Sequence, residues 1–281
     1  MTPEDVAFAA ELACLLEASA PKPGNVSPGL HFHDTRYEDF LASAVAIGPA
    51  MAEAGKRPLG ATIRAAIAAT RRVTGRNTNL GIVLLLAPLC RAAGRAGAAS
   101  LRERVAAVLA ETTVADAADV YAAIRQAAPS GLGQAETQDV AEPPTVTLRE
   151  AMALAAGRDA IAREYQTDFA LTFEVGAPAL REARRAGLVW TDATVETYLS
   201  LLASVPDSHI ARKLGLAEAE RVSRRAAEVR DAGGVRTAAG RGAIAELDAE
   251  LRDPRNSRNP GTTADLTAAA LCVIILEDGW N

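Results

Sequence analysis

The sequence predicts an all-α fold, because apolar residues recur at helical spacing and strand-forming residues are scarce. Hydrophobic residues make up 49% of the chain but aromatic residues only 4%, so Ala, Leu, Val and Ile must fill the core through close helix–helix contacts. No clean two-residue alternation competes with this spacing. A chain of 281 residues is compatible with one large core, and we expect a single domain over residues 1–281.

Apolar residues three and four positions apart predict helices through most of the chain. Two further runs, Leu80 to Cys90 and Leu266 to Leu276, are continuously apolar but cover only about half of the roughly 20 residues that span a bilayer. We therefore expect both runs to be core helices, with no membrane segment. The periodic stretches are Val6 to Leu16, Phe40 to Met51, Ile63 to Val73, Leu101 to Leu109, Val114 to Ile124, Leu148 to Ile161, Phe169 to Leu180, Val195 to Val205, Leu216 to Val229 and Ile244 to Leu251.

A segment rich in Gly, Pro and polar residues separates the two halves. Gly131, Gly133 and Pro143 predict a loop or flap over 129–146. A second domain beginning there is the alternative, but the same Ala-rich helical pattern on both sides favours one domain.

Charge and cysteine usage narrow the class of protein. The chain has 30 basic and 35 acidic residues, and a net charge of −5 argues against a general nucleic-acid binder. Cys14, Cys90 and Cys272 each lie in an apolar stretch without metal or disulfide spacing, so we expect buried thiols.

The acidic N-terminus lacks the basic region of a signal peptide, which favours the cytoplasm. The sequence is compatible with a homodimer.

Four polar segments lie at predicted helix ends, where free N–H groups and the positive dipole end attract anions. The first, Ala20 to Val26, contains two prolines and a glycine around Lys22 and Asn25. Lys22 is able to contact a phosphate as a point charge. The alternative is a rigid linker with an exposed lysine.

The second segment, Gly29 to Phe40, contains His31 and His33 together with Asp34 and Asp39. Magnesium is usually held by one or two carboxylates plus phosphate oxygens, so this segment is a candidate Mg²⁺ site. Zinc is disfavoured, because no further His or Cys stands at ligand spacing. The alternative is that Asp34 or Thr35 caps the next helix, while Glu38 and Asp39 face its N-terminal dipole.

The third segment, Gly75 to Gly81, directly precedes an apolar helix. Arg76, Asn77 and Asn79 can present donors to a phosphate or sugar, and Gly81 permits a close approach to the backbone. The segment lacks the lysine and hydroxyl residue of a P-loop. An ordinary capped turn is the alternative.

The fourth comprises two late pieces, Pro206 to Arg212 and Asn259 to Leu266. Asp265 opens a run that stays apolar to Leu276, which makes it a candidate metal or ribose ligand, or a capping residue. His209 is more often structural than catalytic when alone, although Arg212 lies one helical turn away.

Taken in order, these segments resemble the triphosphoribosyl-dephospho-CoA synthase family. Members of that family carry P-K-P-G-L-V-D, G-A-H-K-D, N-T-H-K-G, a D-T-N-V-A-S-R-like stretch and S-P-G-G-S-A-D-L. The corresponding stretches here are P-K-P-G-N-V-S, L-H-F-H-D, N-T-N-L-G, D-S-H-I-A-R-K and N-P-G-T-T-A-D-L. Each motif alone is weak, but the ordered set runs from near residue 20 to near residue 276.

The resemblance implies an all-α enzyme that removes adenine from ATP and transfers the triphosphoribosyl part to the ribose 2′-hydroxyl of dephospho-CoA, with Mg²⁺ as the expected cofactor. Such a reaction needs stabilisation of positive charge at the anomeric carbon, a polyphosphate site and a base near the acceptor hydroxyl. The polar segments and the resemblance together give the candidate residues: His31, His33, Asp34 and Asp265 for catalysis, Lys22, Asn25, Arg76, Asn77, Thr78, Asn79, His209, Arg212 and Asn259 for substrate, and Asp34, Asp39 and Asp265 for metal.

One departure bears on the acceptor. The family's His-Lys pair in N-T-H-K-G is Asn79-Leu80 here, which removes a candidate base and a cation. Two alternatives to the dephospho-CoA reaction are an enzyme of tetrahydromethanopterin-linked one-carbon metabolism that uses a nucleotide or phosphoribosyl substrate, and a non-catalytic helical protein that binds a nucleotide.

Overall fold

The structure is a computed structural model that describes residues 1–129 and 133–280. Within these residues the chain forms α-helices, one π-helical turn and one 3₁₀ turn, with no β-strand, which confirms the predicted all-α fold. The elements are α1 (Pro3–Ser19), α2 (Tyr37–Ala52), α3 (Leu59–Val73), α4 (Leu80–Ala93), α5 (Leu101–Ala110), α6 (Val114–Ala127), α7 (Leu148–Ala155), α8 (Ala160–Gln166), η1 (Thr172–Gly176), α9 (Ala177–Arg185), α10 (Trp190–Ser204), α11 (Ser208–Leu214), α12 (Leu216–Asp231), η2 (Gly234–Arg236), α13 (Ala238–Leu251) and α14 (Gly261–Asp278).

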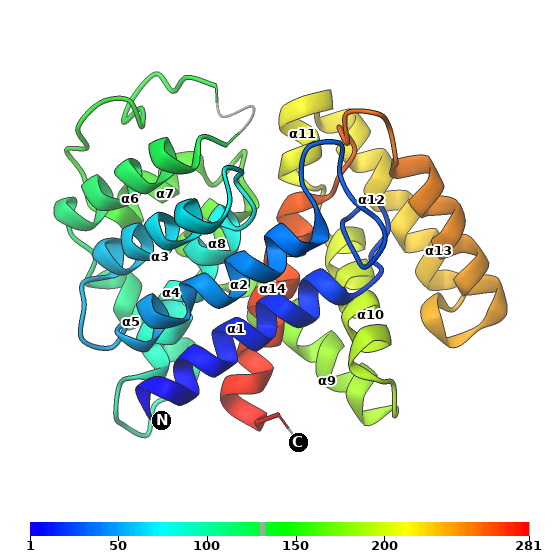
Figure 1. The fold of residues 1–281 in the computed structure, drawn as a ribbon, viewed down its shortest axis with the longest axis horizontal. Coiled ribbons are helices and arrows are strands. Elements are labelled where there is room, and N and C mark those ends of the chain that lie inside the picture. The colour runs from blue at the N-terminus through cyan, green and yellow to red at the C-terminus, as the bar shows by residue number, and fades with distance from the viewer. Residues whose placement is uncertain (130–132, 281) are drawn as a thin grey trace.

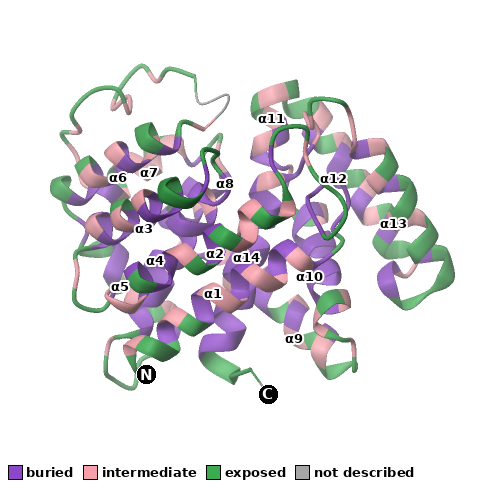
Figure 2. Cartoon of the chain, in the orientation of Figure 1, coloured by how far each residue is buried: buried purple, intermediate pink, exposed green. Residues whose placement is uncertain are grey.

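Helix α14 lies at the centre of the molecule. Figure 1 shows α3 to α8 on one side of it and α10 to α13 on the other, with α1 and α2 crossing in front. Every residue from Leu266 to Leu276 is buried, as expected for a helix that is apolar all round. One apolar core joins α14 to α1, α4 and α6, and a second lies among α10, α12 and α13 (Figure 2).

Small residues allow the close helix contacts that the composition predicts. A Cβ atom on Gly60 of α3 would lie 2.5 Å from the Asp116 carbonyl oxygen on α6, so the two backbones touch there. The Gly60 N–H also donates to the Asp116 carboxylate at 2.8 Å. Position 60 therefore has no room for a side chain.

The helix predicted over Leu148 to Ile161 is two helices, α7 and α8, and that prediction was wrong. A turn at residues 156–158 ends α7, and the Asp159 side chain accepts from the backbone N–H groups of Ile161 and Ala162 to begin α8. The apolar spacing of the sequence continues through this break because α7 and α8 both bury a face in the same core.

The segment between α6 and α7 is irregular where the structure describes it. The Tyr121 hydroxyl donates to the Gln138 carbonyl at 2.6 Å, and Arg125 donates to the Val140 carbonyl, so α6 holds this part. Residue Gly131 of the predicted loop lies outside the described residues. In the described part of the chain, no helix has the length and apolar character needed to cross a bilayer.

Candidate functional site

A cavity of about 900 Å³ opens where the polar turns meet the ends of several helices. This volume is near the top of the range of about 300–1,000 Å³ typical of small-molecule sites. Its lining comes from the loops at 32–35, 75–79 and 255–259 and from α4, α6, α7, α8, α11 and α14. Segments far apart in sequence therefore share one enclosed space.

Most of the site residues predicted from the sequence line this cavity, and three do not. Lys22, His31 and Asp39 lie outside the lining. Those that line it are Asn25, His33, Asp34, Arg76, Asn77, Thr78, Asn79, His209, Arg212, Asn259 and Asp265.

Lys22 is buried in the fold rather than presented to the cavity. Its ammonium group lies 3.0 Å from the Glu17 carboxylate and donates to the backbone carbonyls of Glu17 and Ala20. Both side chains of the pair are almost fully buried. The lysine thus neutralises Glu17, and it is Glu17 that reaches the cavity wall.

His31 and Asp39 are engaged in local structure at the start of α2. The His31 Nδ1 atom accepts from the Tyr37 N–H at 3.1 Å, and the Asp39 carboxylate accepts from the Arg36 N–H at 2.8 Å. The latter bond is half of a capping box in the first turn of α2. Asp39 therefore lies at the helix N-terminus, as the alternative for this segment expected, but the N-cap is Arg36 rather than Asp34 or Thr35.

Asp34 lies at the exposed rim of the cavity. Its carboxylate is 3.7 Å from the Arg76 guanidinium and 3.8 Å from His33 Nδ1. His33 in turn lies 3.0 Å from the Asn256 side chain, which brings the loop near residue 33 against the loop near residue 256. Two of the polar segments are therefore joined at the mouth.

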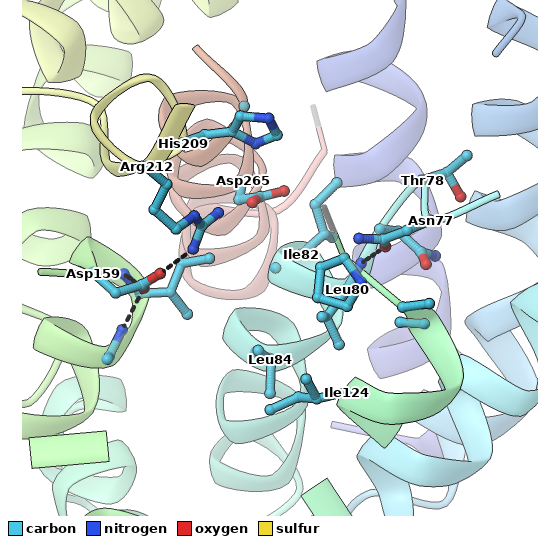
Figure 3. A pocket seen from close by; sticks show the side chains of 18 of the residues that line it. Asn77, Thr78, Leu80, Ile82, Leu84, Ile124, Asp159, His209, Arg212 and Asp265 are labelled. Atoms are coloured by element: carbon cyan, nitrogen blue, oxygen red, sulfur yellow. Dashed lines mark hydrogen bonds and ion pairs between the residues drawn. The ribbon is translucent and has the colours of Figure 1, made fainter. Parts of the chain in front are cut away.

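Asp265 lies inside the cavity, on the first turn of α14 (Figure 3). A Cβ atom on Gly81 would lie 2.0 Å from Asp265 Oδ2, so the carboxylate packs directly on the backbone at the start of α4. Burial raises the pKa of Asp265 well above its usual range, and the nearby Glu17 and Asp207 carboxylates raise it further. Among the described residues, no donor forms a hydrogen bond or ion pair with it.

A second buried carboxylate, Asp207, fixes the helices that bring Asp265 and His209 to the cavity. One oxygen accepts from the N–H groups of His209 and Ile210 at the start of α11. The other accepts from the N–H group and hydroxyl of Thr263 on α14 at 2.7 and 2.8 Å. The N-termini of α11 and α14 are thereby held together by a single side chain.

The same helices position Arg212 and His209. Arg212 donates to the Asp159 carboxylate at 2.6 Å, which links α11 to the start of α8 (Figure 3). Burial lowers the pKa of His209 to about 3, assisted by the adjacent Lys213 and Arg212. His209 is therefore neutral near pH 7. Its buried Nε2 atom has no hydrogen-bond partner among the described residues, which leaves it available to a bound molecule.

Several charged lining residues were not predicted from the sequence: Glu17, Arg71, Asp139, Arg158, Asp159, Lys213 and Arg255. Lys213 follows Arg212 on α11, and burial lowers the pKa of its ammonium group. The lysine in the D-S-H-I-A-R-K stretch was the available signal. Isolated arginines on periodic helices carried no signal that separates them from ordinary surface charges.

Magnesium was expected at Asp34, Asp39 and Asp265. Within residues 1–129 and 133–280, no group of three or more His, Cys, Asp or Glu side chains is arranged to hold a metal ion. Asp39 is used in capping and Asp34 lies beside Arg76, whereas the Asp265 carboxylate faces the cavity unpaired. A divalent cation bound through one carboxylate and substrate phosphates fits only Asp265 among these three.

Comparison with known proteins identifies the family. The family model described as ATP:dephospho-CoA triphosphoribosyl transferase matches residues 3–281. The chain belongs to this family. The resemblance inferred from the ordered motifs is thus confirmed.

Individual relatives agree with this assignment. A 2-(5''-triphosphoribosyl)-3'-dephosphocoenzyme-A synthase of Klebsiella pneumoniae is 32% identical over 108 residues, and a protein of Stutzerimonas stutzeri assigned the same activity is 35% identical over 106. These alignments cover 38% of this chain, and 38% and 36% of the respective relatives, well under two thirds of their length. A crystal structure of an Archaeoglobus fulgidus protein assigned as a triphosphoribosyl-dephospho-CoA synthase has a TM-score of 0.67 at 30% identity, covering 86% of this chain and 100% of that chain.

The structure shows what replaces the His-Lys pair of the transferase family motif. Asn79 precedes α4 and donates to the Thr70 hydroxyl at 3.0 Å, while its buried Oδ1 atom has no partner in the described chain. Leu80 adds an apolar side chain to the cavity lining. The candidate base and the cation of the family motif are therefore replaced by an amide side chain and an aliphatic side chain.

Replacing Lys22 should destabilise the fold, because Glu17 would be left charged and buried without a partner. We expect Lys22→Met to lower the free energy of unfolding by about 3–5 kcal/mol, measured by urea denaturation. The double variant Glu17→Gln/Lys22→Met should recover part of this loss. Lys56→Met, at an exposed lysine, should stay within about 0.5 kcal/mol of the parent protein. Equal losses at the two lysines would contradict the role assigned to Lys22.

Asp207→Asn should loosen the junction of α11 and α14. An amide NH₂ group cannot accept from the N–H donors that face it, and each orphaned buried donor costs about 1–3 kcal/mol. We expect a lower melting temperature and faster hydrogen exchange at the amides of His209, Ile210 and Thr263. Asp192→Asn, which removes a surface pair with Arg241, is the matched control and should change neither. Unchanged hydrogen exchange at these three amides would contradict the role of Asp207 in joining α11 to α14.

Proposed function

We propose that this chain transfers the triphosphoribosyl group of ATP to dephospho-CoA with release of adenine. The observation that carries the proposal is the family match over residues 3–281 combined with a cavity that collects the family's polar motifs. The cavity has room for a nucleotide and contains both cations and an unpaired carboxylate, which a polyphosphate substrate requires.

The reaction breaks the bond between C1′ of the ribose and N9 of adenine and forms a bond between C1′ and the acceptor hydroxyl oxygen. The hydroxyl proton is lost and adenine leaves with a proton, so the overall change is balanced. Positive charge develops at C1′ as the base departs. The Asp265 carboxylate in the cavity lining favours positive charge electrostatically.

Particular side chains can bind the substrates. Lys213 and Arg212 on α11 and Arg76 at the rim provide positive charge for phosphate oxygens. The neutral His209 ring presents an unpartnered Nε2 atom, and Asn79 presents an unpartnered Oδ1 atom, to which a ribose hydroxyl or base edge can hydrogen-bond. The site therefore offers both anion recognition and directional contacts.

We propose that Mg²⁺ enters with ATP and is held by Asp265 together with phosphate oxygens. The unpaired carboxylate and the absence of a cluster of three ligands among the described residues favour such shared coordination over an all-protein metal site. When bound, the ion would neutralise part of the triphosphate charge. Asp34 at the rim is a poorer candidate because Arg76 and His33 lie beside it.

The family and the relatives described above carry triphosphoribosyl transferase or synthase descriptions, so the comparisons favour neither the pterin-linked nor the non-catalytic alternative. The unpaired Asp265 inside the cavity also argues against a vestigial site, because a buried unpaired carboxylate costs stability unless a ligand compensates it.

Adenine release provides the direct test. Incubation with ATP, Mg²⁺ and dephospho-CoA should produce adenine in a one-to-one ratio with consumed dephospho-CoA, as followed by chromatography. Omission of dephospho-CoA should abolish adenine formation. If ATP raises the melting temperature but adenine never appears, the proposed reaction is wrong for this chain.

Asp265→Asn should remove the magnesium-dependent part of ATP binding while leaving the helical signal unchanged. Without the substitution, ATP at about 100 times its dissociation constant adds roughly 2.7 kcal/mol to stability, measured as a melting-temperature shift with and without Mg²⁺. Asp34→Asn is the matched control and should retain the magnesium dependence. We also expect adenine formation by Asp265→Asn to fall by about 100-fold or more. If Asp265→Asn keeps the full magnesium-dependent shift in melting temperature, Asp265 does not bind the metal.

A further inference from the structure

Three helices contribute only uncharged residues to the cavity lining. Every lining residue contributed by α4, α6 and α7 lacks a charge. We call six of the large apolar side chains in this set the aliphatic wall. The aliphatic wall consists of Leu80, Leu84, Val120, Ile124, Met152 and Leu154.

The charged lining residues come from other elements. Asp34, Arg76 and Arg255 lie on loops, Lys213 lies on α11, and Asp265 lies on α14. Figure 3 shows Leu80, Leu84 and Ile124 on the part of the cavity away from His209 and Asp265. The cavity thus has a polar part and an apolar part that are continuous with each other.

Part of the aliphatic wall is poorly covered by protein. Leu154 is 55% exposed, and Ile124 and Met152 are half-buried although both also contact the core. Exposed apolar side chains that line a cavity favour burial by a ligand. Leu80 extends the wall at the position where the family motif has a lysine.

The wall restricts the chemistry of what it binds. Phosphate groups would lose hydration against it without gaining a cation, so they belong in the polar part. A base edge would find few hydrogen-bonding side chains there, because the Tyr121 hydroxyl already donates to the Gln138 carbonyl. A neutral, mainly aliphatic chain is the group that suits this surface.

Of the two proposed substrates, only the acceptor has such a chain. ATP consists of a base, a sugar and phosphates, whereas dephospho-CoA extends its diphosphate with the uncharged pantetheine arm, which carries two methyl groups and methylenes as well as a hydroxyl, two amides and a thiol. We infer that the aliphatic wall is the subsite for the pantetheine arm of the acceptor and so selects dephospho-CoA over a nucleotide without the arm. This inference rests on the proposed function for the identity of the acceptor.

The test compares dephospho-CoA with ADP, which lacks the arm, by calorimetric titration of the intact protein without ATP. Met152→Glu places a charge in the wall and should raise the dissociation constant of dephospho-CoA by roughly tenfold or more, or about 1.4 kcal/mol. The dissociation constant of ADP should change by less than about twofold. Val45→Glu, at an exposed valine of α2 outside the cavity, is the matched control and should change neither.

A second variant guards against misfolding. Ile124→Ser is milder and should show the same selective loss, with an unchanged helical signal confirming the fold. If the variants weaken the binding of dephospho-CoA and ADP equally, the wall contacts the adenine base. If they weaken the binding of neither, the pantetheine arm binds outside the wall. Both results overturn the inference. Because binding is measured without turnover, selective loss in a protein that never releases adenine would support the subsite while refuting the proposed reaction.

Discussion

The hydrogen bonds to Asp207 set the geometry on which the polar part of the cavity depends. Two helices that are separated by about fifty residues in sequence begin at this carboxylate, and each carries a cavity residue within one turn. A buried carboxylate is a suitable junction because it accepts from several donors at once. The adjacent Ser208 and Thr262 hydroxyls, 3.0 Å apart, add a second link between the same helix ends. The motifs D-S-H and T-T-A-D are therefore two halves of one structural unit.

This junction explains how charge is tolerated next to an apolar core. Asp265 lies about one turn into α14, where burial makes an unpaired carboxylate unfavourable. Its position is held by the packing of α14 and by contact with Gly81, rather than by a hydrogen bond to its own oxygens. The residues that hold this part of the fold together are thus different from the carboxylate that faces the cavity.

The fold class was predictable from the sequence because the apolar spacing is regular in nearly every helix. The boundary between α7 and α8 was not, since the capping role of Asp159 is invisible in a continuous apolar pattern. The ordered turns identified the family and most of the cavity lining. Lys22 illustrates the limit: its neighbouring prolines suggested an exposed turn, but its partner is a carboxylate one turn back in α1. Local spacing does not reveal which way such a side chain points.

The distribution of amines has a practical consequence for labelling. The chain contains only three lysines: Lys22 is sealed in its ion pair, Lys56 is exposed outside the cavity lining, and Lys213 lines the cavity. Burial lowers the pKa of Lys213 and so increases the share of its nucleophilic, unprotonated form. A periodate-oxidised nucleotide, whose dialdehyde forms an imine with amines, would therefore mark a single interior position and map the cavity by peptide mass alone.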